Sequence, residues 1–501
     1  MGHLFVAQGD LTRLACDVIL IACDSRLNVS RVWSRILPKD LPPGDGDWLR
    51  LPDNGGSNVV DLGNHAGRDV RAYVALEDEA TPADIVRRLW SAIDVVSTRL
   101  IPSGGRVRPL IGVPLPGVGS GGLRGRRGEV IDALLELHRA APGSCDIALV
   151  LWDRRDFAAI QTRRDASGRD WPDLTPELLA EADRLGELAR QGQLSLFLGA
   201  GVSRPAGLPD WNELLSRLAE AAGLPEPAVG VEPEVAATAI RAELGDRYHA
   251  VLTQLLDVDH HAVGHAIIAS LRVPQMVTTN FDSCLELAMD HVTHRQYRVL
   301  ARELAQGGTP WLLKLNGDIK VPESVVLTSL DFERHEKEGQ ALRGVVQTLL
   351  LTSHLLFVGY SLREKSFLDL AAEVTRVRQK ALSPDHTSAG SALSLTRKPG
   401  DLNVDHQDLI LVSMNGRSFE EGARVLEIFL DRLCWKAASS DEWAAQYLLD
   451  VDYATGLTDS EKSLRNALRT FLKTVDMKAK SSAGWPTIAK ALRNLGADPE
   501  S

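Results

Sequence analysis

Between about residues 190 and 435, short apolar runs alternate with longer stretches whose apolar residues recur at helical spacing. This alternation predicts a parallel β-sheet with helices on both faces. Ligands of such sheets bind beyond the carboxyl ends of the strands, so polar residues that directly follow a strand are site candidates. The predicted strands are Leu194–Leu198, Gln275–Thr279, Trp311–Leu315, Leu355–Gly359, Ala392–Thr396 and Leu409–Val412.

The first 160 or so residues have the pattern of a separate α/β unit. Short apolar runs predict strands, and a glycine-rich loop at residues 116–122 precedes a helical stripe that begins near Val130. The predicted strands are Val18–Ala22, Ala72–Leu76, Val107–Leu115 and Ile147–Trp152.

A chain of 501 residues is too long for one core, which predicts two to four domains. A polar stretch after residue 160 reads as a linker, and Thr175 followed by Pro176 predicts the start of a helix. We therefore predict an N-terminal domain at 1–160, a linker and helix at 161–190, a Rossmann-like domain at 191–437 and a helical region at 438–501. The last region is expected to be a helical cap or an oligomerisation element.

Composition narrows the class of protein. The formal net charge of −11 and the lack of a long basic block argue against direct nucleic-acid binding. No apolar segment is long enough to span a membrane, and the N-terminus lacks the pattern of a signal peptide. The five cysteines have no CxxC spacing, so neither a metal site nor a disulfide framework is predicted. A cytoplasmic protein without a metal is expected.

The segment Phe197–Ser203 is the most informative local motif. An apolar run ends at Gly199 and Gly201, and a helical pattern follows after a Pro/Gly turn. A strand, a glycine turn and a helix present backbone N–H groups to a phosphate, and glycine permits the close approach of a pyrophosphate. A single G-x-G is weak evidence, because many such matches are ordinary tight turns.

Three further motifs follow the predicted strands in order: Thr278–Asp282, Lys314–Asp318 and Gly359–Leu362. Together with the glycine turn they resemble the sirtuin superfamily, particularly the bacterial sirtuin-like domain that destroys NAD in antiphage defence. The resemblance covers about residues 190–435.

The resemblance implies a role for each matched residue. Phosphate binding maps to Gly199, Ala200, Gly201 and Ser203, and contact with the nicotinamide ribose maps to Asn280 and Asp282. Further NAD contacts are expected at Asp210, Thr279, Gly317, Gly359 and Ser361. His265 also matches a recurrent family position, and there we expect packing or hydrogen bonding rather than direct catalysis.

The chemistry agrees with this mapping. Cleavage of the nicotinamide–ribose bond builds positive charge on the sugar, as in other glycoside reactions. Asp282 is expected to offset that charge, and Asn280 to hold a ribose hydroxyl or the attacking water.

Asn316 departs from the family, which has a catalytic His before the glycine of this motif. Asparagine cannot take up a proton near neutral pH. Three explanations stay open: Asn316 orients ribose hydroxyls in a slow hydrolase, the domain is an inactive nucleotide binder, or the chain is a variant that traps substrate. Protein deacylation is disfavoured, because the four-cysteine zinc module of deacylating sirtuins is absent.

The N-terminal unit resembles a macro domain through Gly9–Thr12, the apolar strand that follows, and the glycine loop. The resemblance implies that Asp10 contacts adenine and that four loop residues surround a diphosphate: Gly117, Gly119, Gly121 and Gly122. Cys23-Asp24 stands where hydrolytic macro domains have an Asn, which favours binding over hydrolysis. A degenerate fold without a ligand is the alternative.

The combined hypothesis is an NAD glycohydrolase of antiphage defence that yields nicotinamide and ADP-ribose or a cyclic isomer. Its macro-like domain would sense an ADP-ribose-type signal, and the protein would act as a homo-oligomer. The alternative is a non-catalytic NAD or ADP-ribose binder that acts as a sensor or assembly partner.

Overall fold

The computed structural model describes residues 1–44, 46–53, 55, 57–65, 67–76, 80–119, 122–228, 230–300, 302–362, 365–381, 388–396, 408–439 and 444–497. The chain forms two compact units. The first unit contains residues 1–103, 108–173 and 434–501, and the second contains residues 104–107 and 174–433. The domain boundaries predicted from the sequence stay predictions, although the last residues group with the first unit by their contacts.

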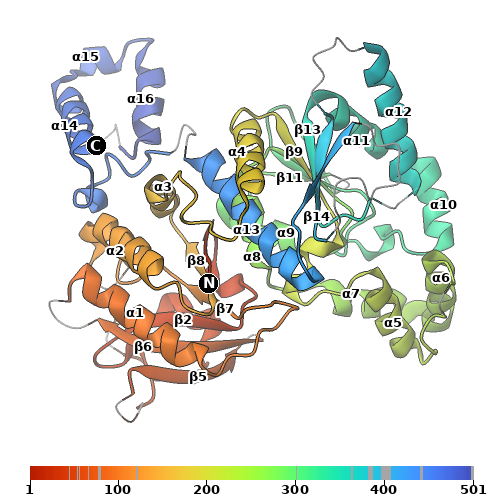
Figure 1. Ribbon diagram of the computed structural model, residues 1–501, viewed down its shortest axis with the longest axis horizontal. Helices are drawn as coiled ribbons and strands as arrows, with labels where there is room; N and C mark the ends of the chain where they lie inside the picture. Colours follow the sequence, from red (N-terminus) through yellow and green to blue (C-terminus); the bar gives the residue numbers. More distant parts are fainter. Residues whose placement is uncertain are drawn as a thin grey trace. The chain divides into compact units, whose positions relative to one another are not determined.

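The first unit contains a six-stranded mixed sheet in the order β1-β8-β7-β2-β6-β5, coloured red to orange in Figure 1. All neighbouring strands are parallel except β5 and β6. The strands are β1 (Leu4–Gln8), β2 (Val18–Asp24), β5 (Val59–His65), β6 (Arg68–Leu76), β7 (Leu110–Val113) and β8 (Asp146–Leu151), with a separate hairpin of β3 (Asn28–Ser30) and β4 (Trp48–Arg50). The sequence pattern found β2, β6, β7 and β8 but missed β1 and β5.

Helices cover this sheet. α1 (Pro82–Ser97) contacts β6 and also α2 (Arg127–Ala140), while α3 (Arg154–Arg163) contacts β1 and β8. The C-terminal region is helical, as predicted, with α14 (Asp459–Thr474), α15 (Met477–Lys480) and α16 (Trp485–Asn494).

The second unit contains seven parallel strands in the order β11-β12-β10-β9-β13-β14-β15. This confirms the predicted Rossmann-like sheet. The strands are β9 (Leu194–Leu198), β10 (Gln275–Thr278), β11 (Arg298–Leu300), β12 (Trp311–Lys314), β13 (His354–Val358), β14 (Gly390–Ser394) and β15 (Leu409–Ser413). The six predicted strands are present, and only the three-residue β11 was missed because it is too short to show a pattern.

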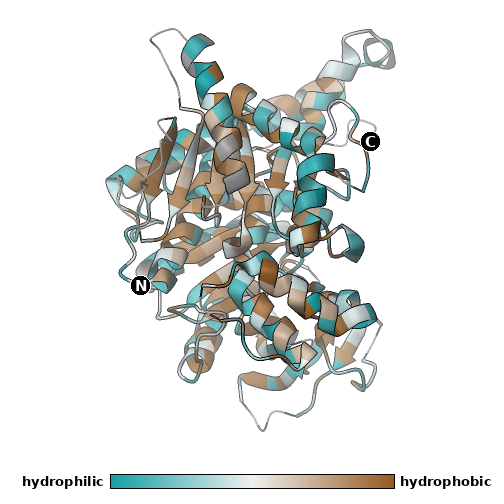
Figure 2. Ribbon diagram, turned by 90° about the vertical axis from the view of Figure 1, so that its right-hand side faces the viewer, coloured by the Kyte–Doolittle hydropathy of each residue, from teal (hydrophilic) through white to brown (hydrophobic). Residues whose placement is uncertain are grey.

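Ten helices of the second unit lie in the described part of the chain. They are α4 (Pro176–Arg190), α5 (Trp211–Ala222), α6 (Pro233–Leu244), α7 (Tyr248–Leu256), α8 (Val263–Ser270), α9 (Cys284–Val292), α10 (Ser329–Glu338), α11 (Gln340–Thr352), α12 (Lys365–Ala381) and α13 (Phe419–Ala438), whose last residues belong to the first unit. Thr175 caps α4 as predicted, because its side chain accepts a hydrogen bond from the N–H of Leu178. Many helices are hydrophobic on one side and hydrophilic on the other (Figure 2).

Aromatic rings fill the core beside the two central strands of the second unit. Phe197 of β9 is fully buried, and its ring centroid lies 5.3 Å from that of Phe357 of β13 and 5.4 Å from that of Phe367 of α12. Such tilted contacts add to the burial of apolar area.

None of the described helices is long and apolar enough to cross a membrane.

The strands that follow β9 in sequence, from β10 to β12, lie on one side of it in the second sheet, whereas β13 to β15 lie on its other side. The order of the strands therefore changes direction between β9 and β13. At this point the turns that follow the two strands touch through their backbones, because the N–H of Gly201 donates to the carbonyl of Gly359 over 3.0 Å. A Cβ on Gly199 would lie 2.6 Å from that carbonyl oxygen, and a Cβ on Gly359, whose φ is +64°, would lie 2.7 Å from the nitrogen of Val202. The contact therefore requires glycine on both turns.

Replacement of Gly199 by alanine tests this contact. We expect Gly199→Ala to destabilise the second unit by about 1–3 kcal/mol, because backbone atoms must move to admit the new methyl group. Gly264→Ala in α8 is the control, since a Cβ there meets no atom within 4 Å. Calorimetry should show a lower Tm for Gly199→Ala and an equal or higher Tm for Gly264→Ala. Equal Tm values for parent and Gly199→Ala would contradict the required contact.

Candidate functional site

The candidate site lies at the edge of the second sheet where the parallel strands end. The segments that follow β9, β10, β12 and β13 carry the four predicted motifs, and parallel strands bring these ends to one edge. Ala200 and Gly201 are exposed on the first turn, whereas Ser203 is buried beneath it.

Ser203 is the centre of a buried hydrogen-bond network. Its hydroxyl donates to Oδ2 of Asp282 over 2.9 Å and accepts from Nδ2 of Asn280 over 3.0 Å. Nε2 of His265 lies 3.3 Å from the same hydroxyl oxygen. Three residues predicted to contact the nucleotide are thus joined directly, and residues 77 to 79 positions apart in sequence meet at one hydroxyl.

His265 is a neutral hydrogen-bond donor in this network. Its Nδ1 accepts from the backbone N–H of Ala262 over 3.2 Å, so the ring proton is on Nε2, the atom that faces Ser203. Burial lowers the pKa of His265 to about 4, although the Asp282 carboxylate acts in the opposite direction. His265 has the hydrogen-bonding role that its position in the sequence suggests.

The side chain of Asn280 is oriented by its neighbours. Its Nδ2 donates to Ser203, and its backbone N–H donates to Oγ1 of Thr278 over 3.0 Å. Its Oδ1 is buried and has no hydrogen-bond partner in the described part of the chain. An unpaired buried acceptor is costly, so this oxygen is suited to a donor on a ligand, such as a sugar hydroxyl or a carboxamide.

Both carboxylate oxygens of Asp282 are already hydrogen-bonded. Oδ2 accepts from Ser203, and Oδ1 accepts from the backbone N–H of Cys284 over 2.9 Å. Its negative charge can act on a ligand through space, while each oxygen already accepts one hydrogen bond from the protein.

His265, Asp282 and Cys284 have ligand atoms within 4.8 Å of one another, which is a spacing that could hold a metal ion. These ligand atoms already take part in hydrogen bonds within the protein, however. Nδ1 of His265 accepts from the N–H of Ala262, and each carboxylate oxygen of Asp282 accepts one hydrogen bond. Burial and the adjacent Asp282 carboxylate raise the pKa of the Cys284 thiol, which disfavours the thiolate form that binds metals. The group is better described as a hydrogen-bonded cluster.

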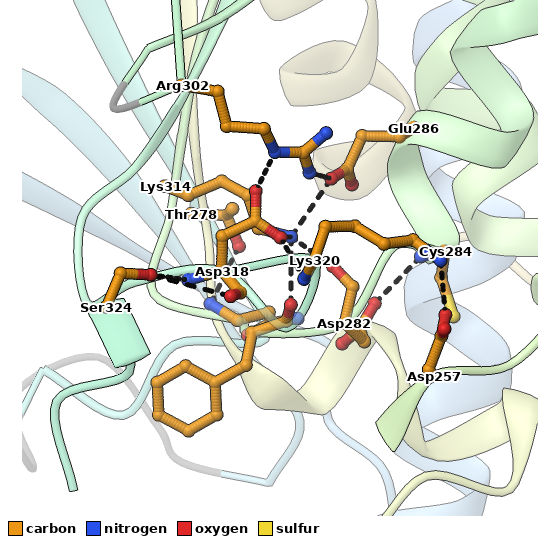
Figure 3. A network of polar contacts seen from close by, with 12 residues as sticks. Asp257, Thr278, Asp282, Cys284, Glu286, Arg302, Lys314, Asp318, Lys320 and Ser324 are labelled. Carbon is orange, nitrogen blue, oxygen red and sulfur yellow. Dashed lines mark hydrogen bonds and ion pairs between the residues drawn. The ribbon is translucent and has the colours of Figure 1, made fainter. Parts of the chain in front are cut away.

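A fully buried lysine holds the turn that carries Asn280 and Asp282. Nζ of Lys314, at the end of β12, donates to the backbone carbonyls of Phe281 over 2.9 Å and Asp282 over 2.5 Å. The ammonium therefore ties two neighbouring strand ends together (Figure 3).

Two carboxylates and an arginine complete this cluster. Lys314 Nζ lies 2.9 Å from Glu286 and 3.4 Å from Asp318, and Arg302 pairs with both carboxylates (Figure 3). Burial raises the pKa of Glu286, although Lys314 opposes this shift. For Asp318, Lys314 and Arg302 outweigh burial, so its pKa is lowered. Sequence reasoning missed Lys314, Glu286 and Arg302, although a lysine that ends an apolar strand was a visible signal.

The Asn-Gly-Asp motif has two members with structural roles. Gly317 has φ +101°, and a Cβ there would lie 2.2 Å from the carbonyl oxygen of Ser324. Asp318 belongs to the charged cluster. Asn316 is largely buried, and its carbonyl accepts from the N–H of Val326 over 2.9 Å, but its side chain has no hydrogen bond to another described residue. The side chain of Asn316 is therefore the member available to a ligand.

The remaining predicted residues lie around this network. Asp210 caps α5 through the N–H of Glu213 and pairs with Arg204 at 2.9 Å, so its carboxylate already serves the fold. Thr279 follows β10 and is partly exposed, and Ser361 is exposed beyond Gly359. Their nucleotide contacts stay predictions.

The first unit contains a cavity of about 550 Å³. Three of the predicted residues line it: Asp10, Gly117 and Gly119. Gly122 is not among the lining residues, and Gly121 lies outside the described residues. The carboxylate of Asp10 also accepts hydrogen bonds from the backbone N–H of Thr12 over 2.9 Å and from its hydroxyl over 2.7 Å. The aromatic and cationic walls were not among the predicted site residues: Trp33, Trp48, Trp152 and Arg127.

Residues 274–413 match the family model of the SIR2-like domain. The matched region includes three of the four motifs, and it confirms the predicted sirtuin resemblance of the second unit. Relatives named NAD(+) hydrolase ThsA include one from Enterococcus faecium, 26% identical over 215 residues that cover 40% of this chain and 44% of the relative. One from Acinetobacter baumannii is 24% identical over 194 residues, covering 36% and 39%.

Defense-associated sirtuin 2 of Bacillus subtilis is 25% identical over 188 residues, which cover 35% of this chain and 18% of that protein. The chain spans less than half the length of these curated relatives. Among solved structures, the Oceanobacillus iheyensis macrodomain with ADP covers 32% of this chain and 87% of its own, at 18% identity and a TM-score of 0.23. The same macrodomain with MES bound covers 32% and 88%, at the same identity and TM-score.

Removal of the Lys314 charge tests the electrostatic cluster. We expect Lys314→Met to cost about 3–5 kcal/mol, because it leaves buried carboxylates and two carbonyls without their ammonium partner. Lys320→Met is the matched control, since the Lys320–Asp257 pair is partly exposed and contributes about 0–1 kcal/mol. Urea unfolding of the second unit should separate the two variants, and equal losses would refute a special role for Lys314.

The pKa of His265 predicts a pH dependence of stability. Below its ordinary pKa of 6.5 the unfolded side chain takes up a proton, whereas the folded side chain does so only near pH 4. The folded state should therefore lose about 1.4 kcal/mol per pH unit as the pH falls through this window. Denaturant unfolding at several pH values should show a shallower decline for His265→Gln. An unchanged slope in this variant would argue against a neutral, buried His265.

Proposed function

We propose that the SIR2-like unit binds NAD and cleaves its nicotinamide–ribose bond, giving nicotinamide and ADP-ribose or a cyclic isomer. The observation that carries this proposal is the buried Oδ1 of Asn280, an acceptor without a protein partner, beside the Asp282 charge. The names of the matched relatives support the same reaction.

Each residue of the site has a role as the nicotinamide–ribose bond breaks and water attacks. The bond between the nicotinamide nitrogen and ribose C1′ breaks, and nicotinamide leaves with the electron pair. The Asp282 charge stabilises the positive sugar, while Asn280 Oδ1 accepts a hydrogen bond from a ribose hydroxyl or from the attacking water. The water oxygen bonds to C1′ and loses one proton to solvent. Ser203 and His265 hold Asn280 and Asp282 in place for this step.

Asn316 limits the rate in this mechanism. A histidine at this position would accept a proton near neutral pH, and an asparagine does not. The second candidate function, a non-catalytic NAD or ADP-ribose binder that serves as a sensor or assembly protein, rests on this residue.

The first unit is proposed to bind a nucleotide and thereby to regulate NAD hydrolysis by the second unit. Its cavity combines Gly117 and Gly119, whose backbone can approach a diphosphate, with three tryptophans that can stack on a base. We propose that it binds an ADP-ribose-type signal and controls NAD hydrolysis in a cytoplasmic homo-oligomer that acts in antiphage defence. Direct nucleic-acid or membrane binding is not part of this proposal.

Nicotinamide release from NAD by the purified full-length chain tests the reaction. We expect slow turnover in the parent, a loss of about 10²-fold or more in Asn280→Ala, and a gain of about 10²–10⁴-fold in Asn316→His. Asn466→Ala, an exposed asparagine of α14, is the control and should match the parent.

The outcomes separate the two candidate functions. If neither the parent nor Asn316→His releases nicotinamide while calorimetry detects NAD binding, the hydrolase is excluded and the binder is favoured. If NAD does not bind at all, both candidates fail. ADP-ribose is added in parallel, and an unchanged rate and assembly state would exclude regulation through the first unit.

A further inference from the structure

The C-terminal segment Asp450–Gly456 packs against residues that line the cavity of the first unit. The hydroxyl of Tyr453, a side chain only 1% exposed, donates to Oδ1 of Asp156. Asp156 lines the cavity, and its other oxygen accepts from NH1 of Arg127 over 2.5 Å. A chain of buried contacts therefore runs from the C-terminal segment through Asp156 to Arg127.

Arg127 is the one lysine or arginine among the described residues that line this cavity. NH1 is engaged by Asp156, while NH2 has a long contact of 3.5 Å to the carbonyl of Val118 in the glycine loop. Nε is buried without a hydrogen-bond partner, and it forms an ion pair with Asp452 at 3.9 Å. The Nε–NH2 edge of a guanidinium is the edge that binds an oxyanion through two parallel hydrogen bonds.

Further contacts hold the C-terminal segment on this wall. Arg155 pairs with Asp450 at 2.6 Å, and Arg163 donates to the carbonyl of Gly456 over 2.6 Å. A Cβ on Gly128, the neighbour of Arg127 in α2, would lie 2.7 Å from the carbonyl oxygen of Thr455. This backbone contact fixes the start of α2 against the segment and limits the positions open to Arg127.

We propose that the C-terminal segment Asp450–Gly456 completes the nucleotide site of the first unit, with Tyr453 as a positioning residue that holds Arg127, through Asp156, to bind a phosphate group of the ligand. The proposal rests on the nucleotide-binding role proposed above for this cavity. Because coupling between two elements is reciprocal, a bound phosphate also stabilises the C-terminal segment. The last helices of the chain thereby respond to occupancy of the cavity.

Binding to the full-length chain tests this positioning role. The probes are ADP-ribose and ADP, which carry phosphates, and adenosine, which carries none. We expect Tyr453→Phe to weaken binding of ADP-ribose and ADP about tenfold, because Asp156 loses a charge-assisted hydrogen bond and Arg127 its orientation. Adenosine affinity should not change. Arg127→Lys keeps the charge but loses the two-donor edge, and it should show the same selective loss.

Tyr447→Phe is the matched control. Tyr447 is equally buried in the C-terminal region and donates to Glu461 over 2.5 Å, but it does not line or reach the cavity. It should bind all three probes as the parent does. Hydrogen exchange in the parent should show that ADP-ribose protects both the start of α2 and residues 450–456. Protection at these residues also distinguishes ligand binding in the cavity from binding at the turn Gly199–Ser203 of the second unit.

Three results would overturn the proposal: unchanged ADP-ribose affinity in Tyr453→Phe, an equal loss for adenosine and ADP-ribose, or no protection of residues 450–456. Failure of ADP-ribose to protect the start of α2 would overturn it as well. Nicotinamide release is a separate readout in the other unit, so failure here does not decide whether the SIR2-like unit hydrolyses NAD.

Discussion

The site of the second unit depends on one backbone contact, where the glycine turns after β9 and β13 meet. The two strands run side by side, with Leu198 opposite Val358, and the turns after them stay hydrogen-bonded through Gly201 and Gly359. The space between the turns has no room for a side chain, since a Cβ on Gly199 or Gly359 would overlap backbone atoms of the other turn. This close approach lets the first turn fold back so that Ser203 lies beneath it, next to the end of β10.

A second constraint acts on the neighbouring pair of strands. The buried ammonium of Lys314 binds the carbonyls of Phe281 and Asp282, so β12 holds the turn that presents Asn280. Lysine is rarely this buried, and its charge is tolerated because Glu286 and Asp318 surround it. The Ser203 network and the Lys314 cluster approach the Asp282 turn separately, the first through side chains and the second through backbone carbonyls. Together they hold the turn in which Asn280 Oδ1 has no hydrogen-bond partner among the described residues.

Both units are proposed above to bind a nucleotide, and their candidate sites differ in chemistry. In the second unit the acceptor of an asparagine and a nearby carboxylate suit a sugar that gains positive charge. In the first unit a glycine loop, tryptophans and the edge of Arg127 suit a base and its phosphates. The C-terminal segment Asp450–Gly456 packs next to Arg127 through Asp156, and it belongs to the first unit rather than to the second.

The sequence by itself determined the class of fold and most of the strands, because alternating apolar runs and helical stripes report local burial directly. The sirtuin resemblance assigned Ser203, Asn280 and Asp282 to one nucleotide site, and the structure joins the three side chains by hydrogen bonds. Their contacts with a nucleotide stay predictions. The short β11 carried too few residues for a pattern, and β1 and β5 were missed although each is long enough to carry one. The sequence could not show that Asp210 and Asp318 use their carboxylates within the fold, or that Lys314 joins two strand ends. Nor could it show that Tyr453 reaches Asp156 across 297 positions. These roles depend on which side chains share a low-dielectric space, and only the tertiary structure decides that.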